Sequence, residues 1–94
     1  VVCARGGYGS MRILPFLDFE TIQKNPKIFV GFSDISVLLS VLNDRCGLVT
    51  FHGPVVTTLA NAIKETIAAM CAVLTTNTIL ALKPEKGIFI KPGV

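Results

Sequence analysis

One serine lies where the chain is expected to turn from a strand into a helix. Ser33 stands in the run Gly31-Phe32-Ser33-Asp34, after an apolar segment and before a helical pattern. A sharp turn of this kind exposes the hydroxyl, and the amide of Asp34 would point into the same space at the positively polarised start of the helix. This arrangement suits nucleophilic attack on a carbonyl, because the amide stabilises the resulting oxyanion. The pattern is incomplete, since the familiar elbow has glycine two places after the serine and this chain has Ile35.

A structural role explains the same two residues. Serine and aspartate are preferred at helix N-caps, where capping stabilises a helix by about 1 kcal/mol. Because both roles require the start of a helix, the residues alone leave Ser33 and Asp34 open between a helix cap and a catalytic turn.

A glycine-rich loop, Arg5-Gly6-Gly7-Tyr8-Gly9, follows the first apolar segment. Glycines allow positive φ and can turn backbone amides toward a phosphate, a carboxylate or an oxyanion. The loop lacks the Lys-Ser/Thr ending of a P-loop and the G-x-G-x-x-G spacing of a dinucleotide site, which argues against a nucleotide. Arg5 could clamp a substrate carboxylate or form a salt bridge at the sheet edge. Tyr8, in the same loop, is a second candidate for substrate binding.

His52 is the only histidine in the sequence. A triad of Ser33, Asp34 and His52 is disfavoured, because an acid adjacent to the serine would have to bend around the helix start to orient the imidazole. We expect a structural His52 that is hydrogen-bonded to backbone at a strand end. A single histidine without a cluster predicts no metal site.

The surrounding pattern alternates between strands and helices. Strand-like segments are expected at residues 1–4, 27–32 and 48–51, and at 78–82 and 87–90. Helices are expected at 9–18 with a break at Pro15, at 18–22, from Ile35 to a stop at Cys46-Gly47, and from Leu59 to Leu74. This alternation predicts an α/β fold: a layered, flavodoxin-like domain, incomplete, with a mostly parallel sheet.

The polar segments fall after the predicted strands. The loop at 5–9, the pair Ser33-Asp34 and the run His52-Gly53-Pro54 each follow one. Since reactive groups of parallel sheets gather beyond the carboxyl ends of the strands, we expect all three at one edge.

Composition excludes several classes of protein. Of the 94 residues, 51% are hydrophobic and 16% charged, which is too apolar for a disordered chain. The longest uninterrupted apolar run, residues 67–74, is far shorter than the roughly 20 residues of a membrane span. The net charge of +3 comes from scattered cations, which form no basic stripe for nucleic acid. The length suits one domain, and a beginning in mid-strand leads us to expect a fragment.

Three cysteines stand among apolar neighbours without a CxxC pair: Cys3, Cys46 and Cys71. Their odd number suits no disulfide framework. We expect buried, reduced thiols in a cytosolic protein.

Taken in order, these segments resemble the LD-carboxypeptidase family of serine peptidases, which includes muramoyltetrapeptide carboxypeptidases and the microcin C immunity peptidases. The resemblance covers residues 1–56, while 57–94 are similar only loosely, at the Lys91-Pro92-Gly93 end. It rests on the 5–9 loop with Arg12, Leu14, Leu17 and Asp18, and on the runs at 25–27, 31–36 and 47–54.

The resemblance implies a cytoplasmic enzyme, commonly a homodimer, that removes terminal D-alanine from an L,D-peptide bond of murein peptides without a cofactor. It implies an N-terminal α/β domain, of which residues 1–94 would be a part, and a β-rich C-terminal domain that is absent here, with the active site between them. Ser33 matches the nucleophile, and the amides of Asp34 and of Gly6 or Gly7 match the oxyanion hole. His52 matches a position outside the triad. The catalytic Glu and His belong to the second domain, so the chain alone is expected to hydrolyse nothing.

Other functions stay open. A microcin-type immunity peptidase would use the same serine on an acyl-sulfamoyl adenylate. A non-catalytic α/β module would bind a small anion in its glycine loop, with Ser33 as a helix cap. An inactive remnant would carry the same residues.

Overall fold

The structure is a computed structural model that describes residues 1–77. The strand-like segments predicted at 78–82 and 87–90, and the Lys91-Pro92-Gly93 end, lie outside the described residues.

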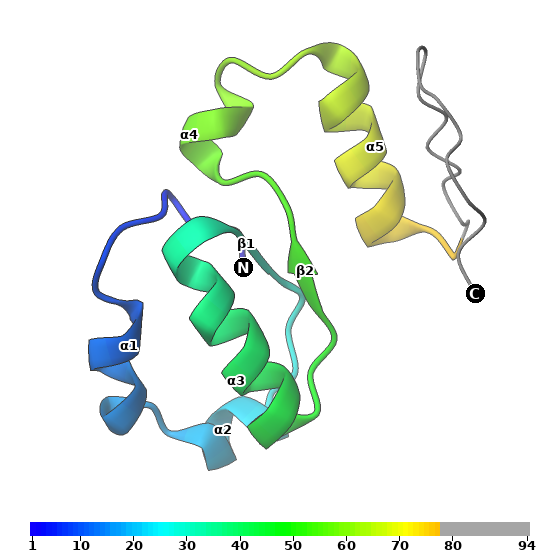
Figure 1. The fold of residues 1–94 in the computed structure, drawn as a ribbon. Helices are drawn as coiled ribbons and strands as arrows, with labels where there is room; N and C mark the ends of the chain where they lie inside the picture. The colour runs from blue at the N-terminus through cyan, green and yellow to red at the C-terminus, as the bar shows by residue number, and fades with distance from the viewer. Residues whose placement is uncertain (78–94) are drawn as a thin grey trace, which may run out of the picture.

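A small parallel sheet forms the centre of the fold (Figure 1). Strand β1 (Phe29–Gly31) pairs with β2 (Thr50–His52) in parallel, with Val30 opposite Phe51. Val2 forms a parallel bridge to Val30 on the other side of β1, through hydrogen bonds from Val30 N to Val1 O and from Cys3 N to Val30 O. The α/β class and the parallel sheet are therefore confirmed, although the first predicted strand is reduced to one bridge.

The helices before β2 follow the predicted order. Helix α1 (Ser10–Ile13) passes into the 3-10 turn η1 (Leu14–Phe16), so the break expected at Pro15 is confirmed. Helix α2 (Phe19–Lys24) begins at Asp18, whose carboxylate accepts a hydrogen bond from Thr21 N.

Helix α3 (Ser36–Cys46) covers the sheet, and the turn η2 (Ser33–Ile35) leads into it from β1. It ends at Gly47, whose φ of 64° is the left-handed conformation that glycine adopts without strain. The predicted stop at Cys46-Gly47 is confirmed.

The core lies between α3 and the sheet. Val30 and Val55 are each only 1% exposed, and the other buried apolar residues are Leu38, Leu39, Leu42, Cys46 and Leu48. Helix α2 packs on this cluster through Phe19 and Ile22. Leu48 was predicted inside a strand, but it lies two residues before β2 and its side chain is buried in the core. The chain turns at Gly47, and the Leu48 amide donates a hydrogen bond to Leu42 O, so Leu48 is not paired in the sheet.

The helix predicted from Leu59 to Leu74 is confirmed from Lys64 onward and is wrong before that residue. Residues of this segment form two helices, α4 (Val56–Leu59) and α5 (Lys64–Thr75), separated by an extended backbone at Ile63. Tertiary bonds fix the direction of α4, because Val56 N donates to Cys3 O and Thr57 N to Ala4 O. A helical stripe in the sequence carries no information about such bonds.

Helix α5 buries none of its residues and stands apart from α1, α2 and α3 in Figure 1. Ile67 is 41% exposed and Val73 42% exposed. The prediction of three buried cysteines is wrong for the same reason: Cys46 is buried and Cys3 half-buried, but Cys71 is exposed on α5.

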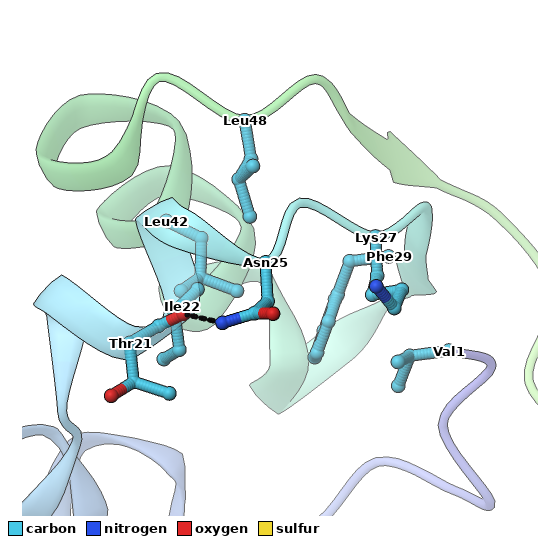
Figure 2. A pocket seen from close by; sticks show the side chains of 8 residues that line it. All are labelled: Val1, Thr21, Ile22, Asn25, Lys27, Phe29, Leu42 and Leu48. Atoms are coloured by element: carbon cyan, nitrogen blue, oxygen red, sulfur yellow. Dashed lines mark hydrogen bonds between the residues drawn. The ribbon is translucent and has the colours of Figure 1, made fainter.

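A cavity of about 300 Å³ opens near the amino end of β1, between α2 and α3 (Figure 2). Most of its wall is apolar, and Asn25 Nδ2 donates to Thr21 O at its rim. Its lining residues are Val1, Thr21, Ile22, Asn25, Lys27, Phe29, Leu42 and Leu48. The cavity therefore lies away from the carboxyl edge of the sheet, where the polar segments gather.

Among residues 1–77, no helix has both the length and the apolar character needed to cross a bilayer.

Candidate active site

The chain reverses sharply at Ser33. Phe32 is fully extended, with φ of −153° and ψ of −178°, whereas Ser36 is already helical. Between them Ser33 has a φ of 61°, and within the described chain it is the single residue other than glycine with a positive φ. The left-handed region costs a non-glycine residue roughly 1–2 kcal/mol, so this turn is strained. A strained strand-to-helix turn is the conformation that holds a nucleophilic serine above a sheet edge in other hydrolase folds.

The helix-cap alternative is wrong for both residues. No backbone amide of η2 or α3 donates a hydrogen bond to a side chain at the N-cap, and these N-caps are Phe32 and Ile35. Ser33 is exposed, and its hydroxyl bonds to nothing within residues 1–77, while Asp34 is engaged elsewhere.

Gly31 explains how the turn tolerates Ile35, which occupies the place of the usual elbow glycine. A β-carbon on Gly31 would lie 2.4 Å from Ile35 Cγ2 and 3.0 Å from Ile35 Cβ. The missing side chain at Gly31 therefore provides the space into which Ile35 folds back over the end of β1. The space that a glycine two residues after the serine would provide in the familiar elbow is provided here by Gly31, two residues before Ser33.

The glycine loop lies directly against the serine. A β-carbon on Gly6 would sit 3.1 Å from Ser33 Cβ and 3.3 Å from Ser33 Oγ, which is tighter than ordinary contact. A β-carbon on Gly7 would lie 3.8 Å from Asp34 Oδ2, an ordinary van der Waals distance. A side chain at position 6 would therefore need Ser33 to shift by a few tenths of an ångström, whereas position 7 has room.

The loop differs from the prediction in one respect. Gly6, Gly7 and Gly9 all avoid positive φ, so conformational freedom is not what they supply. The amides of Gly6 and Gly7 donate no hydrogen bond within the part of the chain that the structure describes, and they remain available to a ligand.

Asp34 fastens the far end of this loop. Its Oδ2 accepts hydrogen bonds from Ser10 Oγ at 2.8 Å and from Ser10 N at 3.0 Å. These two bonds, from the side chain first and the amide second, hold the pKa of the Asp34 carboxyl below its ordinary value. Ser10 is 6% exposed, so its hydroxyl is buried against this carboxylate. Asp34 is therefore a structural anchor of the loop.

The third polar segment joins the same edge, as predicted. His52 pairs with Gly31 in the sheet register, and Gly53 N donates to Gly31 O. The predicted hydrogen bond from the His52 ring to backbone is wrong: the exposed ring instead contacts Phe32 edge-to-face, with centroids 6.2 Å apart. Phe32 is the residue before Ser33, so His52 borders the site without joining its hydrogen bonds.

The two candidate substrate-binding side chains reach into solvent. Arg5 is exposed, and the salt bridge considered for it is not formed with any residue up to Asn77. Tyr8 is 98% exposed. No cluster of three His, Cys, Asp or Glu side chains suited to a metal ion occurs in the described range.

Sequence reasoning missed Ser10 and the role of Gly31. Both are easy to locate in the sequence, because Ser10 directly follows the glycine loop and Gly31 lies two residues before Ser33. A buried hydroxyl has no pattern of its own in a sequence, and a glycine needed for close approach looks like any other. The arrangement as a whole presents a free hydroxyl, free amides and an exposed guanidinium at one sheet edge, which suits attack on a carbonyl of an anionic substrate.

Comparison with known proteins points in the same direction. A family model described as the LD-carboxypeptidase N-terminal domain matches residues 1–53. The chain is 52% identical over 58 residues to the "Probable murein peptide carboxypeptidase" of Bacillus subtilis, which covers 62% of this chain and 18% of that protein. It is 53% identical over 60 residues to the murein tetrapeptide carboxypeptidase of Pseudomonas aeruginosa, covering 63% and 19%.

The microcin C7 self-immunity protein MccF of Escherichia coli is 49% identical over 49 residues, which are 52% of this chain and 14% of that protein. The chain thus matches less than a fifth of the length of these relatives. No solved structure matches it significantly.

Proposed function

This chain belongs to the LD-carboxypeptidase family, and on that basis we propose that it carries the nucleophile and oxyanion hole of a serine-type LD-carboxypeptidase. The proposed reaction is the release of terminal D-alanine from murein tetrapeptides. The observation that supports it most is the left-handed Ser33 with Gly6 pressed against it, since this turn exposes the hydroxyl beside free loop amides. Two of the relatives are named for murein peptides, which supports the substrate class.

In this mechanism Ser33 Oγ attacks the carbonyl carbon before the D-residue. The serine proton passes to a histidine of the second domain that the family resemblance implies, and the carbonyl oxygen becomes an oxyanion. The amide of Asp34 and an amide of Gly6 or Gly7 donate to that oxyanion. The C–N bond then breaks, the histidine protonates the departing D-alanine amine, and water hydrolyses the acyl-serine. No metal or cofactor takes part.

Recognition of the terminal carboxylate falls to Arg5 in this proposal. The guanidinium is exposed and adjoins Gly6, so it can reach an anion held at the loop. Tyr8, also exposed, would cover the bound peptide. We further propose a cytoplasmic location and a homodimer, as the resemblance implies.

The 94-residue chain by itself is proposed to be inactive. Its only histidine, His52, contacts Phe32 and has no carboxylate partner among the described side chains. The serine therefore lacks the base that would remove its proton. Release of D-alanine by the purified chain, abolished by Ser33→Ala, would contradict this point.

The decisive experiment supplies the second domain that the family resemblance implies. Residues 1–57 would replace the corresponding stretch of the Pseudomonas aeruginosa murein tetrapeptide carboxypeptidase, and D-alanine release from tetrapeptide would be followed. We expect activity in the chimera, and a loss of at least about 10³-fold in kcat for Ser33→Ala. Ser40→Ala, an exposed serine of α3, is the matched control. Equal activity in the two variants would remove Ser33 from the nucleophile's role.

One relative favours a second candidate function. The similarity to MccF, at 49% identity, supports a microcin immunity peptidase built on the same serine. Cleavage of microcin C by the chimera, faster than cleavage of tetrapeptide, would favour it. A simple anion-binding module would instead bind phosphate without any second domain, which titration of the 94-residue chain tests directly.

A further inference from the structure

We propose that Ser10 and Asp34 form a latch that positions the oxyanion hole, an inference that rests on the function proposed above. The two residues are positioning residues and touch no reacting atom. Their contact joins the residue that follows the glycine loop to the residue that follows the proposed nucleophile. It consists of the hydrogen bonds from Ser10 Oγ (2.8 Å) and Ser10 N (3.0 Å) to Asp34 Oδ2.

The loop is held at its other end as well. Cys3 N donates to Val30 O, Val56 N to Cys3 O and Thr57 N to Ala4 O. Residues 5–9 therefore run between two fixed points, one on the sheet and α4 and the other at the latch. Gly6 and Gly7 lie in this span, and their own amides make no bond that would hold them.

The latch connects both proposed donors of the oxyanion hole. One is the main chain of Asp34 itself, and the other is Gly6 or Gly7 across the gap. Because the Asp34 side chain grips Ser10, the two donors keep a set separation. Without the latch, the loop would be fixed only at its first end, and the contact of Gly6 with Ser33 would have to position the rest.

Burial and charge make this contact stiff. Ser10 is 6% exposed and is the single buried polar side chain among residues 1–77, so water competes little for its hydroxyl. Hydrogen bonds to an ionised carboxylate are shorter and stronger than neutral ones. A preorganised oxyanion hole needs this stiffness, because a misplacement of about 1 Å can cost roughly 10²-fold in rate.

The variant series uses the fact that both bonds end on one oxygen. Asp34→Asn can present a carbonyl oxygen at that point and accept both bonds, whereas Asp34→Ala accepts neither. Ser10→Ala removes the hydroxyl bond and leaves the amide bond. The matched controls are Asp44→Ala and Ser40→Ala, both exposed on α3.

The first measurement is independent of activity. In ¹⁵N relaxation of the 94-residue chain, Asp34→Ala should lower the order parameters of the Gly6 and Gly7 amides from about 0.85 to below about 0.6. Asp34→Asn and Asp44→Ala should leave them near the wild-type values. Unchanged Gly6 and Gly7 in Asp34→Ala would overturn the latch, whatever the kinetics show. If Asp34→Ala fails to fold, Ser10→Ala against Ser40→Ala decides the point in the same way.

The second measurement uses the chimera described above. Asp34→Ala should lower kcat by about 10- to 100-fold and change KM less than about threefold, and Asp34→Asn should recover most of kcat. Affinity for a boronic acid analogue of the tetrahedral intermediate should fall in parallel with kcat, which a loss of folded protein would not cause. An unchanged kcat in Asp34→Ala would overturn the positioning role. Full activity of Ser33→Ala would overturn the proposed function alone, because the relaxation result stands without it.

Discussion

Two helices of nearly equal length, α3 and α5, differ in how far their apolar residues are buried. Helix α3 buries Leu38, Leu39, Leu42 and Cys46 against the sheet and α2. Helix α5 also carries an apolar stripe, but none of its residues is buried, and side chains such as Met70 and Leu74 are only half-buried. Periodicity therefore predicts that a helix forms, but burial depends on what stands opposite. The site belongs to the α3 side of this comparison, where a packed helix gives Ser33 and Asp34 a rigid base.

The largest expected effect tests this contrast directly. Leu42→Ala should lower the free energy of unfolding by roughly 2–5 kcal/mol, because it removes a side chain that is 4% exposed. Ile67→Ala on α5 should change it by less than about 0.5 kcal/mol. Urea denaturation followed by circular dichroism measures both. Comparable losses in the two variants would show that α5 is packed in solution.

The next test concerns the turn at the start of α3. Gly31→Ala should destabilise the chain by about 1–3 kcal/mol, since its β-carbon would overlap Ile35 Cγ2 at 2.4 Å. Gly9→Ala is the matched control, because nothing lies within 4 Å of a β-carbon there. Removing the clashing methyl with Ile35→Ala should rescue part of the loss. An unchanged free energy of unfolding in Gly31→Ala would mean that Ile35 does not pack as closely against Gly31 as the structure shows.

A smaller effect is the difference in stability between glycine and alanine variants, which should have opposite signs at Ser33 and Ser40. At Ser33, whose φ is 61°, glycine should be more stable than alanine by about 1 kcal/mol. At Ser40, inside α3, alanine should be more stable than glycine by a similar amount. Thermal denaturation of the four variants provides the comparison. The same order at both positions would argue against the strained turn.

The smallest effect is a response to acid. Hydrogen bonds from the Thr21 amide and hydroxyl lower the pKa of the Asp18 carboxyl, which caps α2. A lowered folded-state pKa adds stability that is present above about pH 4, near the unfolded pKa, and is lost as pH falls through the folded value.

Helix α5 has no side-chain cap at Ile63, so its helical signals should stay constant over the range in which α2 loosens. The Thr21 amide shift, followed from pH 6 to pH 2, reports this, and Asp18→Asn should abolish the transition. A Thr21 shift that ignores pH would show that the cap is not formed.

Much of the site could be predicted because it depends on local order along the chain. A strand followed by a polar turn occurs three times in the sequence. This pattern predicted that the glycine loop, Ser33 and His52 lie at one edge of the sheet, and the pairing of Gly31 with His52 in the register confirms it for the ends of β1 and β2. The stop at Gly47 followed equally from a local rule. The nucleophilic role of Ser33 remains a prediction, although its conformation is the one such a role requires.

The rest depends on contacts between distant residues, which no local pattern records. The bond from Ser10 to Asp34 spans 24 positions, and those from Val56 and Thr57 reach back to the first four residues. The same limit explains the two differences at α4 and α5, which are where the helix begins and how far its residues are buried. An apolar stripe in the sequence does not show whether another element packs against it.

The tether from α4 to the first strand has a practical consequence. The match to the family model ends at residue 53, but the packed part of the chain extends further. Val55 is 1% exposed, and the next two residues hold the main chain just before the glycine loop. A polypeptide trimmed to the residues that match the family model would lose Val55 and the two hydrogen bonds from Val56 and Thr57, so a minimal expressed version should extend past residue 60.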